Sequence, residues 1–437
     1  MFRLFVILVI DLIAFTVILP LLPSILLHYE KFSGENEDSL LRSTLMLMNS
    51  TKEKLNMPNT DRYNSVLIGG FLGSLFSFLQ FICNPVFGAL SDIMGRKRIL
   101  IVTMLGTALS YFVWLKSNTF KLFLLSRIIG GLSKGTVTVA TAMMSDITTK
   151  ENRGKGMAVI GIAFGVGFTV GPLCGAYFAS DLSASLKNPF QSAAKFSLTL
   201  QIIAVILTML TVRESPKPAK GIATRERISA AFALINPVSL LNSCLYWKED
   251  PDRVAIKQLT VVHFGYLLLF SGLEFTLTFL THQRFGFGNR QQGMLFLYLG
   301  VLMMLIQGGY VRRAKVNQER SLAIFGISSM IPSMVLVAFS NSTLILCTGL
   351  TFYAFGAATV VPCLTALYSQ RASSIESGEM LGIFRSAGAL ARAMGPFLMC
   401  FVYWTFGSTL CYLSGALLFV LPLGLCSIMR IEDVKKD

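Results

Sequence analysis

Six ionisable side chains interrupt long apolar segments of this sequence: Asp11, Arg127, Lys134, Glu274, Arg385 and Arg392. A charged side chain at the centre of a membrane-spanning segment costs on the order of 3 kcal/mol, so such residues usually face a bundle interior or a watery cavity. A partly desolvated carboxylate can exchange a proton, and a buried cation can bind an anion. We therefore take these six residues as candidates for contact with a substrate or a coupling proton.

The spacing of the four cations adds a geometric argument. Arg127 and Lys134 are seven residues apart, and the same spacing separates Arg385 from Arg392. Seven residues make about two helical turns, so each pair is expected on one face of its helix. Four cations against two acids predict a positively charged interior. Two alternatives stay open: Arg127 as a brace for helix packing, and Asp11 as the counter-ion of a neighbouring cation.

Composition decides which elements can hold these residues. The chain has 437 residues, of which 53% are hydrophobic and 14% charged, with a mean hydropathy of +0.63. Soluble domains carry about 25% charged residues. The sequence therefore predicts a polytopic membrane protein and excludes a soluble enzyme or a nucleic-acid reader, and the net charge of +15 is typical of basic cytoplasmic loops. No catalytic triad, metal cluster or nucleotide-binding loop is present, so we expect no enzyme activity, cofactor or metal.

Twelve apolar runs are long enough for membrane-spanning helices. They cover about 4–27, 64–87, 98–116, 121–145, 157–179, 196–212, 258–281, 291–311, 321–339, 343–367, 380–403 and 406–429. The prediction is an all-α integral membrane protein with a six-helix half (1–212), a cytoplasmic linker (213–257) and a second six-helix half (258–437).

The distribution of Lys and Arg favours cytoplasmic termini at both ends. Asn49 then lies in an outside loop, within an Asn-Ser-Thr triplet that could carry a glycan. Within the linker, residues 224–246 are either a short amphipathic helix on the inner leaflet or a loosely ordered connector.

A second constellation follows the second run, in the segment GALSDIMGRKR that begins at Gly88. Small glycines suit a tight turn, and an acid beside basic residues can pair across neighbouring helix ends. Such a pairing would form a latch that breaks when helices move. A plain positive-inside loop would explain the basic residues but not the spacing of glycine and aspartate. The residues assigned to the latch are Gly88, Asp92, Gly95, Arg96, Lys97 and, at the end of the fourth run, Asp146.

Glycine–proline pairs recur six runs apart. The fifth run carries Gly167, Gly171 and Pro172, and the eleventh carries Gly395 and Pro396. Glycines at helical spacing let helices approach closely, and the recurrence indicates two related halves. We expect these five residues to act as hinges in a conformational change.

These motifs together resemble those of the major facilitator superfamily. The loop after the second run is similar to the loop motif of that superfamily, although Ile93 stands where most members carry arginine. Asp11 with Pro20 and Pro23, and the Gly171–Pro172 pair, resemble the drug/proton antiporters. Segments such as SGLEF, which begins at Ser271, resemble the animal tetracycline transporter-like branch, over essentially the whole chain.

The resemblance implies a transporter with the major facilitator fold that works by alternating access. Its expected partners are an anionic, amphipathic organic substrate, protons as the coupling ion and the lipid bilayer, with no nucleic acid. It implies proton-coupled antiport or efflux. Separately, we expect a monomer in the plasma membrane, with endomembranes and the nuclear envelope as alternatives because the sequence carries no recognised sorting signal. A uniporter, a symporter, a channel and a non-transporting receptor or scaffold with the same fold remain as other interpretations.

Overall fold

The computed structural model describes residues 1–22, 64–149, 152–180, 190–214, 251–313, 318–371 and 377–429, with a few single positions between 25 and 50. These parts of the chain are helical and contain no strand. Asn49 and the 224–246 stretch of the linker lie outside the described residues.

The helices before the linker are α1 (Phe2–Thr16), α4 (Asn64–Met94), α5 (Arg96–Leu115), α6 (Phe120–Ser133), α7 (Thr136–Ile147), α8 (Arg153–Ser180) and α9 (Gln191–Thr211). Those after it are α12 (Pro251–Phe285), α13 (Asn289–Leu305), a π-helical turn (Ile306–Tyr310) with a 3-10 turn (Val311–Arg313), α14 (Glu319–Ala338), α15 (Thr343–Arg371), α16 (Ser377–Leu418) and α17 (Val420–Ile428).

Eleven spans in the described part of the chain are long and apolar enough to cross a membrane. The first predicted span is represented by α1, which ends at Thr16 and continues into turns around Pro20, because proline supplies no backbone donor for a continuing helix. With α1 counted, the helices match the twelve predicted runs, and the all-α membrane fold is confirmed.

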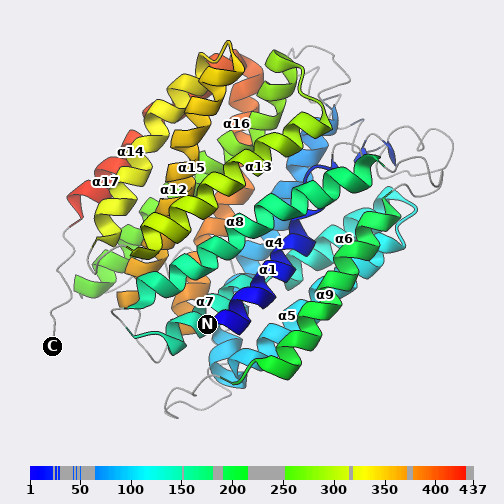
Figure 1. Ribbon diagram of the computed structural model, residues 1–437, viewed down its shortest axis with the longest axis vertical. Helices are drawn as coiled ribbons and strands as arrows, with labels where there is room; N and C mark the ends of the chain where they lie inside the picture. Colours follow the sequence, from blue (N-terminus) through cyan, green and yellow to red (C-terminus); the bar gives the residue numbers. More distant parts are fainter. Residues whose placement is uncertain are drawn as a thin grey trace.

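The helices form one elongated bundle with two groups lying side by side (Figure 1). Helices α12 to α17 make up one group, and α1 and α4 to α9 the other. The groups meet where α4 packs along α16 and where α8 packs against α13 and α15. In Figure 1, α1 begins and α17 ends at the same end of the bundle.

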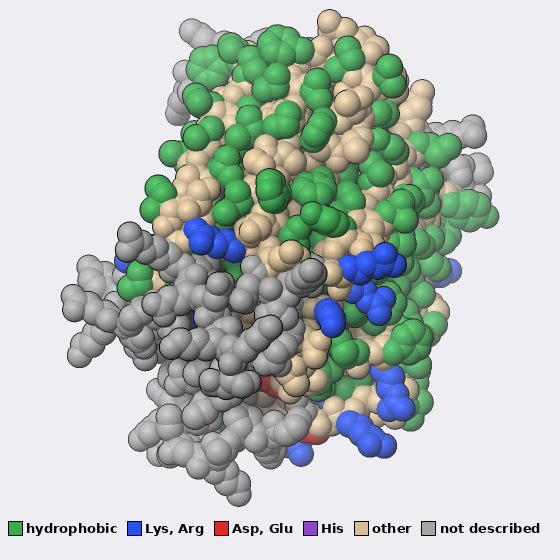
Figure 2. All heavy atoms as spheres, turned by 60° about the vertical axis from the view of Figure 1, so that its left-hand side comes forward, with side chains coloured by type: hydrophobic (Ala, Val, Ile, Leu, Met, Phe, Trp, Pro, Cys, Tyr) green, Lys and Arg blue, Asp and Glu red, His purple; other side chains and the backbone are tan. Residues whose placement is uncertain are grey.

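Hydrophobic side chains cover much of the outer face of the bundle. In Figure 2 they spread over its upper and right-hand parts, while Lys and Arg side chains lie toward the lower part. Large apolar side chains such as Leu210, Leu344 and Ile428 are more than three-quarters exposed. A surface of this kind is stable in hydrocarbon but not in water.

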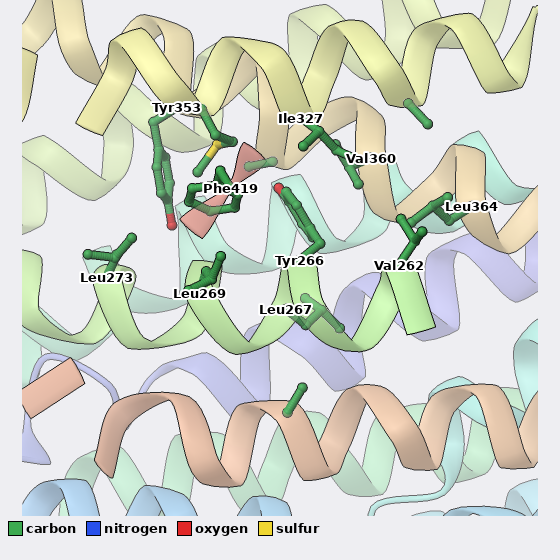
Figure 3. Close-up of a cluster of buried hydrophobic side chains, with 14 of the residues drawn as sticks. Val262, Tyr266, Leu267, Leu269, Leu273, Ile327, Tyr353, Val360, Leu364 and Phe419 are labelled. Atoms are coloured by element: carbon green, nitrogen blue, oxygen red, sulfur yellow. The ribbon is translucent and has the colours of Figure 1, made fainter. Parts of the chain in front are cut away.

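The core of the second group lies between α12, α14 and α15 (Figure 3). Tyr266 on α12 and Tyr353 on α15 are buried within it. The hydroxyl group of each tyrosine has no hydrogen-bond partner among the described residues. This half therefore contains buried polar groups inside an otherwise apolar core.

Two backbone breaks shape the bundle. The fourth span is divided between α6 and α7 at Lys134 and Gly135, where the Gly135 N–H donates to the carbonyl of Ser133 over 2.8 Å. A Cβ atom at Gly135 would lie 2.8 Å from Cγ of Phe87, so α4 leaves room only for glycine. The eleventh and twelfth spans meet at Gly407, whose φ of 82° and ψ of 171° are accessible essentially to glycine alone.

We expect Gly407→Ala to lower the free energy of unfolding by about 1–3 kcal/mol, because alanine is strained in this backbone conformation. Gly424→Ala is the matched control: neither glycine has an atom within 4 Å of an added Cβ, and Gly424 is helical. Thermal unfolding of the purified protein in detergent measures both. Equal melting temperatures for the two variants would contradict the assignment of strain to Gly407.

Candidate functional site

A buried ion pair joins the first and fourth spans. Lys134 Nζ donates to Asp11 Oδ2 over 2.6 Å, and the two side chains are 4% and 0% exposed. Gln201 Nε2 on α9 donates to the other oxygen, Asp11 Oδ1, over 3.0 Å. Lys134 also lies 4.8 Å from the centre of the Phe15 ring. Desolvating both charges is costly, and their short separation and the Gln201 hydrogen bond offset that cost.

The break in the fourth span changes the predicted arrangement of Arg127 and Lys134. The spacing predicted one face of a continuous helix, but α6 ends at Ser133 and Lys134 has a ψ of 58°. Lys134 meets Asp11, whereas the Arg127 guanidinium lies 5.4 Å from the ring centres of both Trp114 and Phe123. The prediction of a shared helical face is wrong because the turn at Gly135 interrupts the helix.

Arg127 itself is surrounded by aromatic rings. It is 6% exposed, its Nε donates to Ser126 Oγ over 3.3 Å, and its Nη2 has no hydrogen-bond partner among the described residues. Cation–π contacts stabilise a buried guanidinium without neutralising it. This environment fits a packing brace and leaves the positive charge uncompensated.

The remaining embedded charges belong to α12 and α16. Arg385 Nη2 donates to Thr141 Oγ1 on α7 over 3.1 Å, so this arginine bridges the two groups of helices. Arg392 interacts electrostatically with Glu274 on α12, and also with Arg385. Arg385, Arg392 and Glu274 each keep part of the side chain accessible, unlike Asp11 and Lys134.

His263 on α12 lies between these cations and the core. Its ring stacks on Phe384 with 4.0 Å between ring centres, and Phe384 in turn packs on Tyr368 at 4.4 Å. His263 is 1% exposed, as expected for a packed residue. Its charge-bearing neighbours are Arg385 and Arg392.

The central charges do not balance one for one. In the described part of the chain, buried ion pairs join Lys134 to Asp11 and Arg96 to both Asp92 and Asp146. No described carboxylate lies within ion-pair distance of Arg127, Arg385 or Arg392. Three embedded guanidinium groups therefore have at most the long-range compensation of Glu274.

The predicted latch residues meet around Arg96. Arg96 Nη2 lies 2.5 Å from Asp92 Oδ1 and its Nε 2.9 Å from Asp146 Oδ2, which joins the ends of α4, α5 and α7. Its Nη1 donates to Ser91 Oγ over 2.6 Å. Gly95 forms the turn with a φ of 106°. Arg96 thus bridges two acids on different spans.

Two latch residues take other places than expected. Gly88 lies within α4 and not in the turn, at a close contact where a Cβ at Gly382 of α16 would lie 3.4 Å from Gly88 Cα. The Nζ of Lys97 donates to the Met209 carbonyl over 2.8 Å, and its backbone N–H to Glu214 Oε1 over 3.1 Å. Lys97 therefore ties α5 to the end of α9.

The glycine–proline pairs occupy equivalent places in the two groups. A Cβ at Gly171 on α8 would lie 2.9 Å from the Ile13 carbonyl oxygen of α1, and one at Gly167 would lie 2.6 Å from Leu12 Cβ. In the second group, a Cβ at Gly395 on α16 would lie 3.1 Å from the Gly272 nitrogen of α12. Pro172 and Pro396 follow within the same helices. Both pairs mark backbone contacts as close as glycine allows.

Several site residues escaped the sequence reasoning. Gln201 is a polar residue in an apolar run, and this feature could have marked it as a buried hydrogen-bonding residue. Thr141 and Ser91 have no such feature, because small hydroxyl residues are common in apolar helices. Gln307 is 2% exposed, lies in the π-helical turn, and has a side-chain oxygen without a partner in the described part of the chain. The described residues contain no cluster of His, Cys, Asp or Glu suited to a metal.

Comparison with known proteins agrees with the fold and the motifs. The Major Facilitator Superfamily domain matches residues 4–396. Human major facilitator superfamily domain-containing protein 10 is 40% identical over 420 residues, which cover 95% of this chain and 90% of that protein. The class H tetracycline resistance protein of Pasteurella multocida is 28% identical over 81% of this chain and 84% of its own length.

A solved structure supports the same assignment. The crystal structure of the human organic anion transporter MFSD10 (TETRAN) superposes with a TM-score of 0.87 at 38% identity, covering 97% of this chain and 98% of that one. The chain therefore belongs to the major facilitator superfamily, and it is a multi-pass membrane transporter.

Proposed function

We propose that this transporter moves organic anions, including amphipathic drugs, by proton-coupled alternating access. The observation that carries the proposal is the excess of positive charge at the centre of the bundle. Arg127, Arg385 and Arg392 have no carboxylate within ion-pair distance among the described residues. An anionic substrate compensates such charges, whereas a cation would add to their repulsion.

The relatives support this substrate class. The human protein of known structure is described as an organic anion transporter, and the bacterial relatives are tetracycline resistance proteins. The Gly171–Pro172 pair of α8 favours antiport, which is one sense of proton coupling.

We place the anionic group of the substrate between Lys134 and Arg392, which belong to different groups of helices. Arginine offers directional hydrogen bonds to a carboxylate or sulfonate, and lysine a compact charge. Arg385 is a further contact, because its Nε has no partner in the described part of the chain and its guanidinium already reaches α7. Phe384, the residue before Arg385, is fully buried and packs between the rings of His263 and Tyr368, so it does not contact the substrate in this proposal.

The proposal includes an orientation and a location. Both termini lie on the cytoplasmic side, as the distribution of basic residues favours, and the protein acts as a monomer in the plasma membrane. The common end at which α1 begins and α17 ends supports placing the termini together.

Truncating either cation tests the anion site. Lys134→Ala and Arg392→Ala should each weaken anion affinity by about 2–5 kcal/mol, or tens- to thousands-fold, because a desolvated anionic group loses its partner. Lys195→Ala, which removes an exposed lysine of α9, should leave affinity unchanged. Binding and saturable uptake of aromatic carboxylates and sulfonates by proteoliposomes measure the effect. Unaltered anion affinity in both single variants would refute the site, and absence of saturable anion uptake by the wild-type protein would refute the function.

The network around Arg96 should control rate more than affinity. Asp92→Asn should slow uptake severely while substrate binding stays within a few fold, because the far end of this network, Asp146, lies about 18 Å along the fourth span from Lys134. Glu319→Gln neutralises a buried acid of α14 instead and serves as the control. Turnover and affinity measured separately in proteoliposomes distinguish the two effects. Wild-type turnover in Asp92→Asn would remove the network from the mechanism.

The contact of α8 with α1 should be mechanical. Gly171→Ala should slow transport, and Gly171→Leu should block it or open a proton leak, because even a Cβ approaches the Ile13 carbonyl too closely. Gly165→Ala on the same helix is the control, since its Cβ would meet atoms no nearer than 3.6 Å. Uptake and proton leak in proteoliposomes provide the readout. Tightly coupled, unchanged transport in Gly171→Leu would reduce this contact to a packing detail.

A further inference from the structure

Two phenylalanine rings of the first group of helices lie beside the proposed anion site. We propose that Phe15 and Phe76 form an aromatic subsite that contacts the ring of the substrate, so that the transporter selects aromatic anions over saturated anions of the same size and charge. This inference rests on the proposed anion site at Lys134. It adds a position for the organic body of the substrate.

The two rings belong to different helices and pack against each other. Phe15 on α1 and Phe76 on α4 have ring centres 5.6 Å apart and planes inclined by 29°, and each side chain is partly accessible. Glycines of α6 make room for this arrangement. A Cβ at Gly130 would lie 3.2 Å from Phe76 Cε2, and one at Gly131 would lie 3.0 Å from the Phe76 carbonyl oxygen. Three helices therefore hold the pair, while part of each ring stays open to contact.

The pair lies next to the cation that holds the anionic group in the proposed site. Lys134 Nζ lies 4.8 Å from the centre of the Phe15 ring. Phe15 also follows Asp11 by four residues, so it lies about one turn farther along the same face of α1. Asp11 and Lys134 are both buried at the centre of the first group. The accessible part of the Phe15 ring therefore borders the interior of the bundle and not the lipid.

Other rings near the embedded cations are closed to a ligand. Trp114 and Phe123 make cation–π contacts with Arg127, but they are only 2% and 0% exposed. Phe384 on α16 is also 0% exposed. Among the rings that make cation–π contacts in the described part of the chain, Phe15 alone is partly accessible. An aromatic substrate that reaches an embedded cation therefore meets Phe15 and its partner ring.

The position of the pair indicates which anions fit. In an aromatic carboxylate or sulfonate the ring is bonded directly to the anionic group, so an anion held at Lys134 brings its own ring to Phe15 and Phe76. Aromatic rings attract one another in offset-stacked or edge-to-face arrangements, with centres about 4.5–7 Å apart, because the face of a ring is negative and its edge positive. A saturated ring is at least as apolar but has no such face. The subsite therefore discriminates by aromatic character and not by hydrophobicity alone.

A matched pair of anions tests this selectivity in the wild-type protein. The compounds 2-naphthoate and decahydro-2-naphthoate share one carbon skeleton and one negative charge, and binding of each to the purified protein is measured by calorimetry at neutral pH. The aromatic anion should bind more tightly, although burial of apolar surface by itself favours the saturated one. Saturable binding of both anions without this preference would overturn the inference and leave the anion site standing. Absence of saturable binding by either anion would overturn both.

Variants of the two rings locate the preference. Phe15→Leu and Phe76→Leu should each lower the ratio of aromatic to saturated affinity about two- to tenfold, because leucine keeps an apolar side chain but removes the ring. Phe15→Tyr keeps a ring and should keep the ratio. The control is Phe71→Leu, the same change at a position of α4 that is 56% exposed, and it should also leave the ratio unchanged.

The ratio separates the ring contact from the charge. Loss of the cation–π contact in Phe15→Leu changes the affinity for both anions by the same factor, and Lys134→Ala should likewise weaken both equally. An unchanged ratio in both leucine variants, or an equal fall in Phe71→Leu, would contradict the subsite. Phe76→Leu decides the question even if Phe15→Leu folds poorly, because Phe76 makes no contact with Lys134 among the described cation–π contacts.

Discussion

The cost of placing charge inside an apolar bundle governs the organisation of this transporter. Asp11 and Lys134 meet at 2.6 Å with almost no exposure, and this contact draws together α1, the break between α6 and α7, and, through Gln201, α9. Neither charge is stable there without the other. A change in the contacts of the Lys134 ammonium group would therefore leave the Asp11 carboxylate without its charged partner.

Close helix contact is the condition for such a pair to form. Glycines of α8 bring it against α1, and Gly395 of α16 makes the equivalent contact with α12. The same kind of contact thus recurs in both groups, in keeping with two related halves. At the boundary between the groups, Gly382 packs against α4 near Gly88, and Arg385 reaches α7. The cations of α16 therefore lie where relative movement of the two groups would change their surroundings.

Electrostatic compensation differs between the two groups. In the first group Asp11–Lys134 at the centre and Asp92–Arg96–Asp146 at the helix ends are paired closely, whereas Arg127 has no carboxylate within ion-pair distance among the described residues. In the second, Glu274 interacts with Arg392 at long range, whereas the charged neighbour of Arg385 is Arg392, and both arginines remain partly accessible. The two groups therefore differ in how completely their embedded charges are compensated.

The sequence by itself determined the membrane class, the twelve spans, the family and the identity of the embedded charges, because hydropathy, charge spacing and glycine–proline motifs are local properties of the chain. It predicted the Arg96 network for the same reason. Only the tertiary structure decided which charges meet. The break at Gly135 depends on Phe87 of another helix, and it separates Arg127 from Lys134, which spacing had placed together. Pairing distances, the role of Gln201 and the ring stack around Phe384 all depend on contacts between helices distant in sequence, which no local pattern records.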